Sequence, residues 1–232
     1  MGLIKTGLYV GAGVGIAYLL FRPRTALGAS SVRVTDYGRF KASLRHRAQV
    51  YADYLLAAQD EYRVSPFLLY GIMEIESRSG EILSPPGPSG TGDSGHGHGL
   101  MQIDDRTWSA WLKLVDPATG TPLWQIPREN IRKGADILSS GAKLFTLTKA
   151  VIIKELLIGG EGLPDPRPMR GDLYTRASLA AYNAGPGNVL LAGARGRDPD
   201  SVTYGGNYSM LVLGAASGAL TAFKAAGGTP VT

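Results

Sequence analysis

Three acidic residues, Glu76, Asp93 and Asp104, have the types and spacing that hydrolysis of a sugar polymer requires. That reaction uses one protonated carboxyl to give the leaving oxygen a proton and a second carboxylate to direct a water molecule. Glycines at 90, 92, 95, 97 and 99 surround Asp93, and such a run permits close approach of main chain to a ligand. The sequence therefore indicates an enzyme with these carboxylates around a cleft.

The segment that carries Glu76 predicts a helix beginning at Ser65-Pro66, a capping residue followed by a proline at the first helical position. Helical spacing places Glu76 on the apolar face of this helix, four residues after Ile72, and turns Glu74 away. Apolar surroundings disfavour a charged carboxyl, so we expect Glu76 to be buried with a raised pKa. Taken alone, the pattern also fits a surface glutamate near a helix end.

Two other patterns in the glycine-rich run predict different chemistry. Residues 90–95 fit the dinucleotide-binding pattern G-x-G-x-x-G, but a stretch rich in proline, glycine and serine precedes them where a strand is required. Asp93-Ser94 also resembles a serine-protease nucleophile loop, but the upstream histidine, His46, lies in a charged helical stretch. The surroundings of the two patterns therefore argue against a nucleotide site and against a serine nucleophile.

Three motifs in a fixed order carry a resemblance to a known family. They are E-S-R-S-G at 76–80, G-D-S-G-H-G-H-G-L-M-Q-I-D at 92–104 and A-Y-N-A-G-P-G-N-V at 181–189. Over about residues 45–225 the chain resembles a goose-type lysozyme and, more broadly, the soluble lytic transglycosylase domains. The resemblance implies a mainly α, lysozyme-like fold with a small β-hairpin region. It also implies cleavage of the bond between N-acetylmuramic acid and N-acetylglucosamine in peptidoglycan glycan strands, without metal or cofactor.

The resemblance also assigns roles to individual residues. Glu76 matches the general acid, and Asp93 and Asp104 match two aspartates that position or activate water. Substrate-binding residues are expected at five positions: Tyr182, Asn183, Gln102, Met101 and Ser77.

Some alternatives stay open at this point. The aspartate pair favours hydrolysis to a free reducing end over the intramolecular attack that gives a 1,6-anhydro product, as in a lytic transglycosylase. A non-catalytic, membrane-anchored wall-binding module with a decayed site is the third possibility. Tyr182 also fits a core position and Asn183 a helix end. The proline-rich loop at 84–89 makes the placement of Asp93 less predictable than that of Glu76.

Composition narrows the classes of function. The 232 residues, 44% of them apolar, suffice for a full hydrophobic core, and the absence of cysteine excludes disulfides and thiolate chemistry. The net charge of +5 favours approach to anionic wall polymer or lipid, but no dense basic patch with interleaved aromatics points to nucleic acid. His96 and His98 lack a clear third ligand, so we predict no metal.

Residues 1–25 predict an N-terminal transmembrane anchor. Lys5 is the one charge between residues 3 and 21, and about nineteen residues rising ~1.5 Å each approach the ~30 Å bilayer core. A cleaved secretory signal ending near residues 26–29 is the alternative. One face of this segment carries glycines spaced so that two such helices can associate: Gly7, Gly11 and Gly15.

The charges around the anchor predict an unusual location. Arg22 and Arg24 follow the apolar run, and by the positive-inside rule they conflict with activity on the periplasmic, cell-wall side of a membrane. An enzyme held in a virion membrane, or retained until lysis, would remove the conflict. We therefore expect a membrane-anchored, phage-associated enzyme that acts on the cell wall.

The predicted organisation is an anchor at 1–25, a polar tether at 26–44, a catalytic domain at 45–226 and a tail at 227–232. Within the domain, apolar periodicity predicts helices at 43–61, 105–114, 173–184 and 208–226. Residues 127–158 predict two helices with a break near 139–141, and residues 159–171 and 198–207 predict loops. Trp108 and Trp111 fit either sugar stacking or the core.

Overall fold

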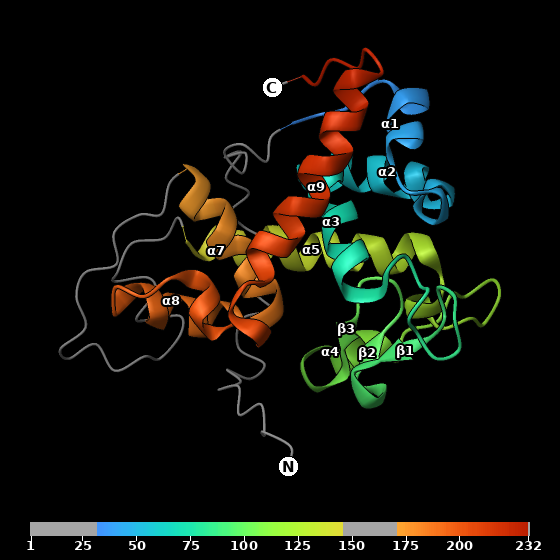
Figure 1. Ribbon diagram of the computed structural model, residues 1–232. Helices are drawn as coiled ribbons and strands as arrows, with labels where there is room; N and C mark the ends of the chain where they lie inside the picture. The colour runs from blue at the N-terminus through green and yellow to red at the C-terminus, as the bar shows by residue number, and fades with distance from the viewer. Residues whose placement is uncertain (1–31, 146–170, 232) are drawn as a thin grey trace. The chain divides into compact units, whose positions relative to one another are not determined.

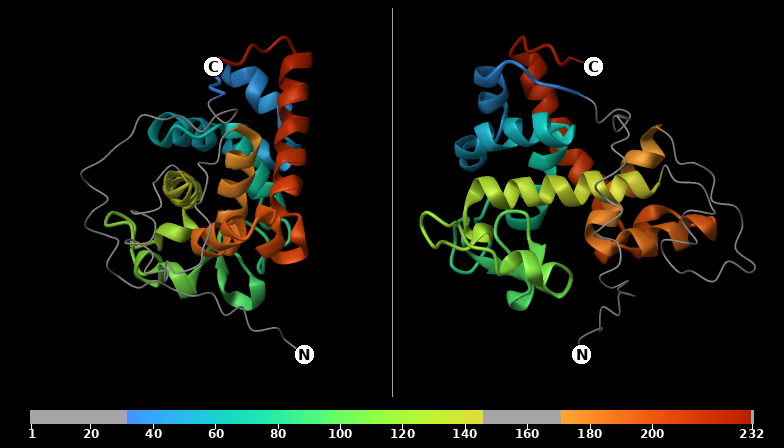
Figure 2. Two further views of the ribbon diagram at one scale, coloured as in Figure 1. Left: turned by 90° about the vertical axis from the view of Figure 1, so that its left-hand side faces the viewer. Right: turned by 180° about the vertical axis from the view of Figure 1, so that it is seen from behind.

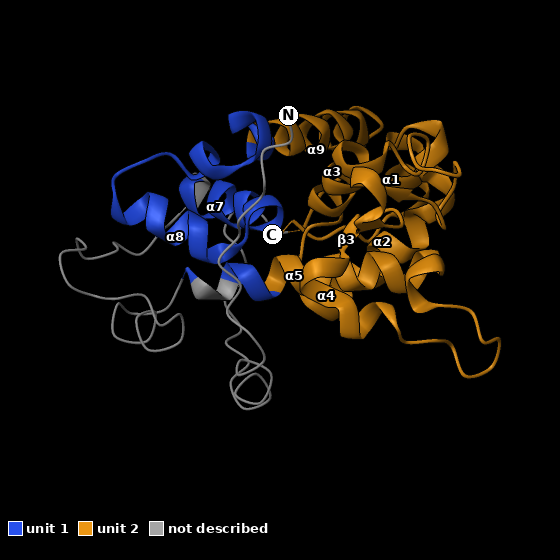
Figure 3. Ribbon diagram, turned by 90° about the horizontal axis from the view of Figure 1, so that it is seen from below, with its two compact units in different colours: residues 1–29, 140–209 blue, residues 30–139, 210–232 orange. Residues whose placement is uncertain are grey.

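The computed structural model describes residues 32–145 and 171–231, which are mainly helical with one small sheet (Figure 1). These residues form two compact units (Figure 3). Unit 1 contains residues 140–145 and 171–209, and unit 2 contains residues 32–139 and 210–231. The architecture agrees with the predicted mainly α class with a small β region.

The elements follow one another along the chain, with 3-10 helices written η. Unit 2 contains α1 (Tyr37–Ser43), η3 (His46–Tyr51), α2 (Ala52–Tyr62), α3 (Pro66–Ser77), η4 (Asp93–Gly95), α4 (Asp105–Leu112) and η5 (Leu123–Gln125). Unit 1 contains α7 (Gly171–Ala184), α8 (Pro186–Ala194), η6 (Pro199–Val202) and η7 (Tyr204–Gly206). Two longer helices have residues in both units, α5 (Pro127–Leu144) and α9 (Tyr208–Ala225).

Helix α3 is the most buried helix of unit 2 and begins as predicted, with Pro66 at its first position. The Phe67 ring lies edge-to-face against Phe40 at 5.3 Å and against Phe223 of α9 at 5.7 Å. Gly71 permits close packing of α3 and α9, because a Cβ there would lie 2.6 Å from the Val212 carbonyl oxygen. Val212, Ala216 and Phe223 of α9 are therefore buried against α3.

The small sheet joins the two segments that carry the predicted aspartates. Its antiparallel strands lie in the order β1 (Thr91–Gly92), β2 (Gly97–His98) and β3 (Ile103–Asp104). Gly92 pairs with Gly97, which pairs in turn with Asp104. Since neighbouring strands lie about 4.8 Å apart, the Asp104 and Gly92 backbones are separated by roughly 10 Å. Asp93 follows Gly92 directly, so the sheet brings the backbones of the two aspartates near one another.

Helix α5 runs from Pro127 to Leu144 without the break expected near residues 139–141 (Figure 2). Gly141 costs a helix about 1 kcal/mol relative to alanine. The flanking Leu138 and Ala142 are buried, and their packing offsets that cost. The expected break is therefore wrong. The second helix expected up to residue 158 lies outside the described residues.

Unit 1 is organised around a buried carboxylate, Asp200, whose side chain is 2% exposed. It accepts hydrogen bonds from the Ser209 backbone N–H at 2.9 Å and the Ser209 hydroxyl at 2.6 Å. The Arg176 guanidinium contacts Asp200 at 3.3 Å and Asp198 at 2.6 Å, and its hydrogen bond lowers the pKa of Asp198. Residues 198–207, expected to be a flexible loop, therefore form η6 and η7 around this network.

Parts of the expected tether and tail belong to the fold of unit 2. Helix α1 lies within 26–44 and buries Phe40 completely. Arg33 and Val231 exchange backbone hydrogen bonds of 2.8 and 3.0 Å, which ties the beginning of the described chain to its end. Removal of the Phe40 ring from water accounts for the difference from the expected polar tether.

Several predictions fall on residues that the structure does not describe. They are the anchor at 1–25 with Gly7, Gly11 and Gly15, and the loop at 159–170. Among residues 32–145 and 171–231, no helix combines the length and apolar character needed to cross a bilayer.

Candidate active site

Glu76 lies in the last turn of α3 and is half-buried, whereas Glu74 is the buried carboxylate of this helix at 7% exposure. Arg45 Nη1 lies 3.3 Å from Glu74 Oε2, and the Ser79 hydroxyl donates a hydrogen bond to Glu74 Oε1. The expected order of burial is therefore wrong. Because α3 is enclosed on almost all sides, its apolar face does not single out Glu76, and the polar partners of Glu74 make its burial tolerable.

Ser77 connects the end of α3 to the glycine-rich run. It is fully buried, and its hydroxyl donates to the Leu100 carbonyl oxygen at 2.7 Å and accepts from the Gly80 N–H at 3.1 Å. The residue beside Glu76 is thereby held against the segment between the two aspartates. Ser77, predicted to bind substrate, has a structural role here.

Asp93 and Asp104 are joined by Arg106, which the sequence reasoning missed. The Arg106 Nη2 atom lies 2.9 Å from Asp93 Oδ2, and Nε lies 3.1 and 3.0 Å from Asp104 Oδ1 and Oδ2. Asp104 also accepts the Arg106 backbone N–H at 2.9 Å, which makes it the N-cap of α4. A signal was present in the sequence, because a cation in the first turn of a helix opposes the helix dipole and needs acidic partners.

The charges of this cluster keep Asp104 ionised. Burial alone would raise the pKa of Asp104, but the hydrogen bonds and charge of Arg106 hold it below its usual range. The hydrogen bonds to Asp104 in turn raise the pKa of the Arg106 guanidinium. The pair can therefore orient a water molecule or stabilise developing positive charge as carboxylates.

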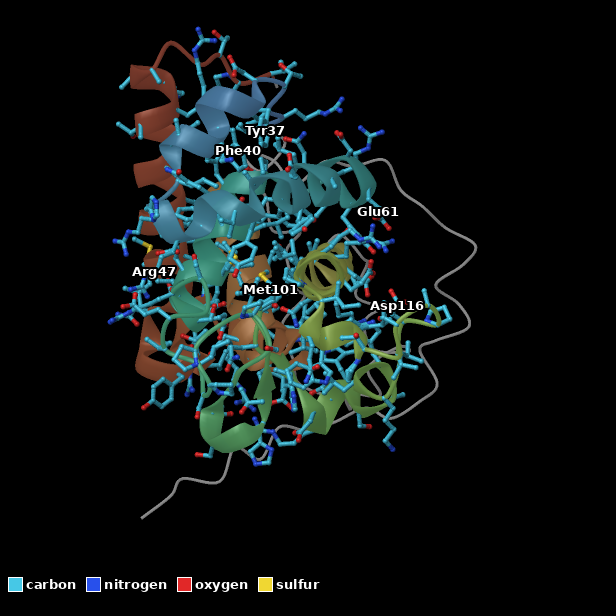
Figure 4. All side chains as sticks on the ribbon, turned by 90° about the vertical axis from the view of Figure 1, so that its right-hand side faces the viewer. Tyr37, Phe40, Arg47, Glu61, Met101 and Asp116 are labelled. Carbon is cyan, nitrogen blue, oxygen red and sulfur yellow. The ribbon has the colours of Figure 1, made fainter. Side chains whose placement is uncertain are left out.

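Two further predicted substrate residues, Met101 and Gln102, pack inside the loop. Met101, labelled in Figure 4, is fully buried. A Cβ at Gly134 of α5 would lie 2.6 Å from its Cε atom. Gln102 Nε2 donates to the Gly99 carbonyl at 2.8 Å. The Gln102 side chain crosses the β1–β2 hairpin so closely that a Cβ at Gly92 or Gly97 would lie within 2.3 Å of Oε1.

Asn130 of α5 is a second residue that the sequence reasoning missed. It is fully buried, accepts the Met101 N–H at 2.8 Å, and donates to the carbonyls of His98 at 3.0 Å and Trp124 at 3.1 Å. Nothing in the local sequence marks it, since its partners lie on other segments. Asn130 anchors the loop that leads from β2 to Asp104.

The histidines of the loop lie around Asp105. His96 Nδ1 is 2.9 Å from Asp105 Oδ1, and His98 Nε2 is 3.9 Å from Asp105 Oδ2. The His98 ring also packs edge-to-face on Trp124 at 4.8 Å. Within the part of the chain that the structure describes, no group of three or more His, Cys, Asp or Glu residues could hold a metal ion.

The tryptophans of α4 are half-buried, and neither is a core residue. The Lys133 Nζ atom lies 3.7 Å from the centre of the Trp108 ring, a cation–π contact with α5.

Tyr182 and Asn183 lie on α7 in unit 1, whereas Glu76, Asp93 and Asp104 lie in unit 2. Both are half-buried. The Asn183 side-chain oxygen accepts the Tyr204 backbone N–H at 3.0 Å, so Asn183 holds the η7 turn in place.

The site thus combines a carboxyl at the end of a buried helix with two carboxylates held by one arginine, and carboxyl groups of these kinds are what glycoside cleavage uses. The family model described as the transglycosylase SLT domain matches residues 53–202. The chain belongs to the transglycosylase SLT domain family. The resemblance stated from the three motifs is thereby confirmed.

Two curated relatives extend this result. The chain is 31% identical over 126 residues to lysozyme g of Struthio camelus, covering 54% of this chain and 46% of the relative. It is 32% identical over 126 residues to lysozyme g of Gallus gallus, covering 54% and 44%. The chain thus spans about half the length of these relatives. Both matches agree with the predicted kind of domain, a lysozyme-like glycosidase or lytic transglycosylase.

Proposed function

We propose that this protein is a muramidase that cleaves the β-1,4 bond between N-acetylmuramic acid and N-acetylglucosamine in peptidoglycan. Glu76 is the general acid that protonates the leaving oxygen, and Asp93 and Asp104 position the attacking water. No metal or cofactor takes part in this scheme.

The observation that carries this proposal is that one guanidinium holds both aspartates, while the third carboxyl comes from a separate helix. Arg106 contacts Asp93 and Asp104, whereas Glu76 is half-buried in the last turn of helix α3. An acid on one element and oriented carboxylates on another are the two parts that glycoside hydrolysis uses. The Ser77–Leu100 hydrogen bond holds the two parts of the site together.

The name of the matched family supports a second candidate, a lytic transglycosylase that forms a 1,6-anhydro-N-acetylmuramic product. In that reaction the C6 hydroxyl of the substrate, rather than water, attacks the anomeric carbon. The aspartate pair favours the hydrolytic route, because a reaction without water has no need of two clamped carboxylates.

The test is mass spectrometry of the muropeptides that the full chain, kept in detergent, releases from purified sacculi. Glu76→Gln should lower product formation by about 100-fold or more, the usual contribution of a positioned acid. Glu81→Gln is the matched control, since Glu81 is an exposed residue paired with Arg47 at 3.0 Å. Retained cleavage by the Glu76→Gln protein, with unchanged thermal stability in both variants, would refute the assignment of the acid.

The proposal includes a membrane-anchored location at the cell-wall side, supported by the apolar run at residues 3–21. Pairing of anchors through Gly7, Gly11 and Gly15 belongs to the same proposal. Alkaline carbonate extraction should leave the full chain in the membrane pellet and release a chain that lacks residues 1–25. Association with a phage particle rests on Arg22 and Arg24, and absence of the protein from purified virions would contradict it.

A further inference from the structure

We infer that Arg106 is a positioning residue that fixes the two aspartate carboxylates and so sets how much cleavage ends in hydrolysis rather than in the 1,6-anhydro product. The inference rests on the proposed function and adds a residue that neither the motifs nor the comparisons single out.

The first argument is geometric. Asp93 and Asp104 come from η4 and β3, which are separate segments, and one planar guanidinium touches both. Asp104 is held through both carboxylate oxygens and through a backbone N–H, so its carboxylate plane is fixed. A guanidinium with several donors in a rigid fork sets orientation as well as distance, which an ammonium group cannot do.

The second argument concerns charge. Two neighbouring carboxylates repel each other, and without a cation one of them would take up a proton. Arg106 is well placed to prevent this, because it opposes both charges at once. The pKa of Asp104 lies below its usual range as a result. The two carboxylates are then both oriented to accept hydrogen bonds from a water molecule.

The two routes differ in the group that attacks. In hydrolysis the water oxygen bonds to C1, the C1–O4 bond breaks, Glu76 gives its proton to O4, and the proton lost by water passes to the aspartate pair. In the intramolecular route Glu76 gives its proton to O4 as the C1–O4 bond breaks, the C6 oxygen bonds to C1, and the C6 hydroxyl proton passes to the Glu76 carboxylate that results. Only the first route uses the aspartates, so disorder of the pair affects hydrolysis selectively.

A purely structural ion pair predicts a different result. If Arg106 only stabilises the start of α4, its loss lowers stability and slows both routes equally. Arg132 provides a matched control, since its guanidinium also joins two carboxylates, Glu61 at 2.6 Å and Glu129 at 2.9 Å, outside the proposed site. The side chains of the two arginines are similarly exposed, at 32% for Arg106 and 37% for Arg132.

The experiment compares Arg106→Lys and Arg106→Ala with Arg132→Lys and Arg132→Ala in the full chain. Initial rates of reducing-end and anhydro products from sacculi are measured together with thermal stability. Since an error of about 1 Å in placement costs on the order of 100-fold, the Arg106 variants should lose roughly 10- to 100-fold in hydrolytic kcat with little change in KM. The share of anhydro product should rise, whereas the Arg132 variants should keep the wild-type ratio.

Three outcomes would overturn the inference. An unchanged product ratio in Arg106→Lys, with a rate loss matching that of Arg132→Lys, would show a structural role alone. If the wild-type protein gives only anhydro product, Arg106 and the two aspartates have no role in hydrolysis, although the protein still cleaves the glycan. A wild-type protein that gives no product at all would refute the proposed function itself. A further check is that Arg106→Ala added to Asp104→Asn should cost little more than Asp104→Asn alone, because both disrupt one unit.

Discussion

Replacement of Asn130 by alanine should loosen the loop that carries Asp104 and lower the stability of the whole protein. The substitution removes three buried hydrogen bonds, at 2.8, 3.0 and 3.1 Å. The Met101 N–H is left without this partner in a fully buried position, which costs about 1–3 kcal/mol. The two carbonyls and the small cavity add roughly 1–2 kcal/mol more. The expected loss is therefore about 2–5 kcal/mol.

The assay is urea unfolding at equilibrium, supported by thermal melting and by hydrogen exchange of the Met101 amide. At ~2–4 °C per kcal/mol for a chain of this length, the melting temperature should fall by roughly 4–20 °C. Exchange at Met101 should accelerate before global unfolding. Arg128→Ala on the same helix is the control, because this exposed side chain pairs with its sequence neighbour Glu129, and its loss should stay within about 0.5 kcal/mol.

Asn130→Asp separates the acceptor from the donor role. The aspartate keeps an acceptor for the Met101 N–H but places a carboxylate oxygen against the His98 and Trp124 carbonyls. Its folded-state pKa is then raised, so its stability should improve relative to wild type as the pH falls and the carboxyl is protonated. A stability loss below 1 kcal/mol for Asn130→Ala, or no gain for Asn130→Asp in acid, would refute the reasoning.

Three further predictions concern stability. Gly71→Ala should destabilise the protein by about 1 kcal/mol or more, because the new Cβ would lie 2.6 Å from a backbone oxygen of α9. Gly218→Ala, with open space around it, should stabilise the protein by about 0.5–1 kcal/mol. Urea unfolding that gives both changes the same sign would contradict this. Asp200→Ala should lower the stability by about 3 kcal/mol, because it removes the acceptor of a buried hydrogen-bond network. Ser201→Ala, at an exposed position, should be nearly neutral in the same assay. Equal effects of the two variants would contradict the role of the network. The lowered pKa of Asp104 means that the unfolded state binds more protons than the folded state. The contribution of Asp104 to the free energy of unfolding is therefore complete above the unfolded pKa of about 4 and is lost as the pH falls through the folded pKa. Between pH 5 and pH 2 the free energy of unfolding should drop more steeply for wild type than for Asp104→Asn, and equal slopes would count against the ion pair.

Local patterns predicted the elements that depend on local physics. The helices near 66–77, 105–112, 171–184 and 208–225 follow from a proline start, an aspartate cap or apolar periodicity, which act within one segment. The continuity of α5 past Gly141 could not be predicted, because the packing of its neighbours decides it.

The site was predicted less completely than the helices, for the same reason. The motifs picked out Glu76, Asp93 and Asp104 as candidates, but the roles of Arg106 and Asn130 depend also on Asp93 and His98, which are 13 and 32 residues away in the sequence. Periodicity also misplaced burial on α3. A helical wheel assumes one solvent-facing side, whereas this helix is covered on almost all sides, and Glu74 is matched by Arg45 and Ser79.

The position of the Gln102 side chain has a consequence for which sequences this loop can adopt. A side chain at Gly92 or Gly97 meets mainly the end of this one flexible glutamine, whereas at Gly90 it would meet the backbone oxygen of Pro85 at 2.0 Å. The glycine at 90 is thus required by the main chain itself, but those at 92 and 97 are required only while residue 102 is long. Shortening residue 102 first should open positions 92 and 97 to alanine, whereas the reverse order passes through a clashing intermediate. Mutational paths through this hairpin are therefore expected to depend on the order of the steps, with Gln102 as the residue that must change first.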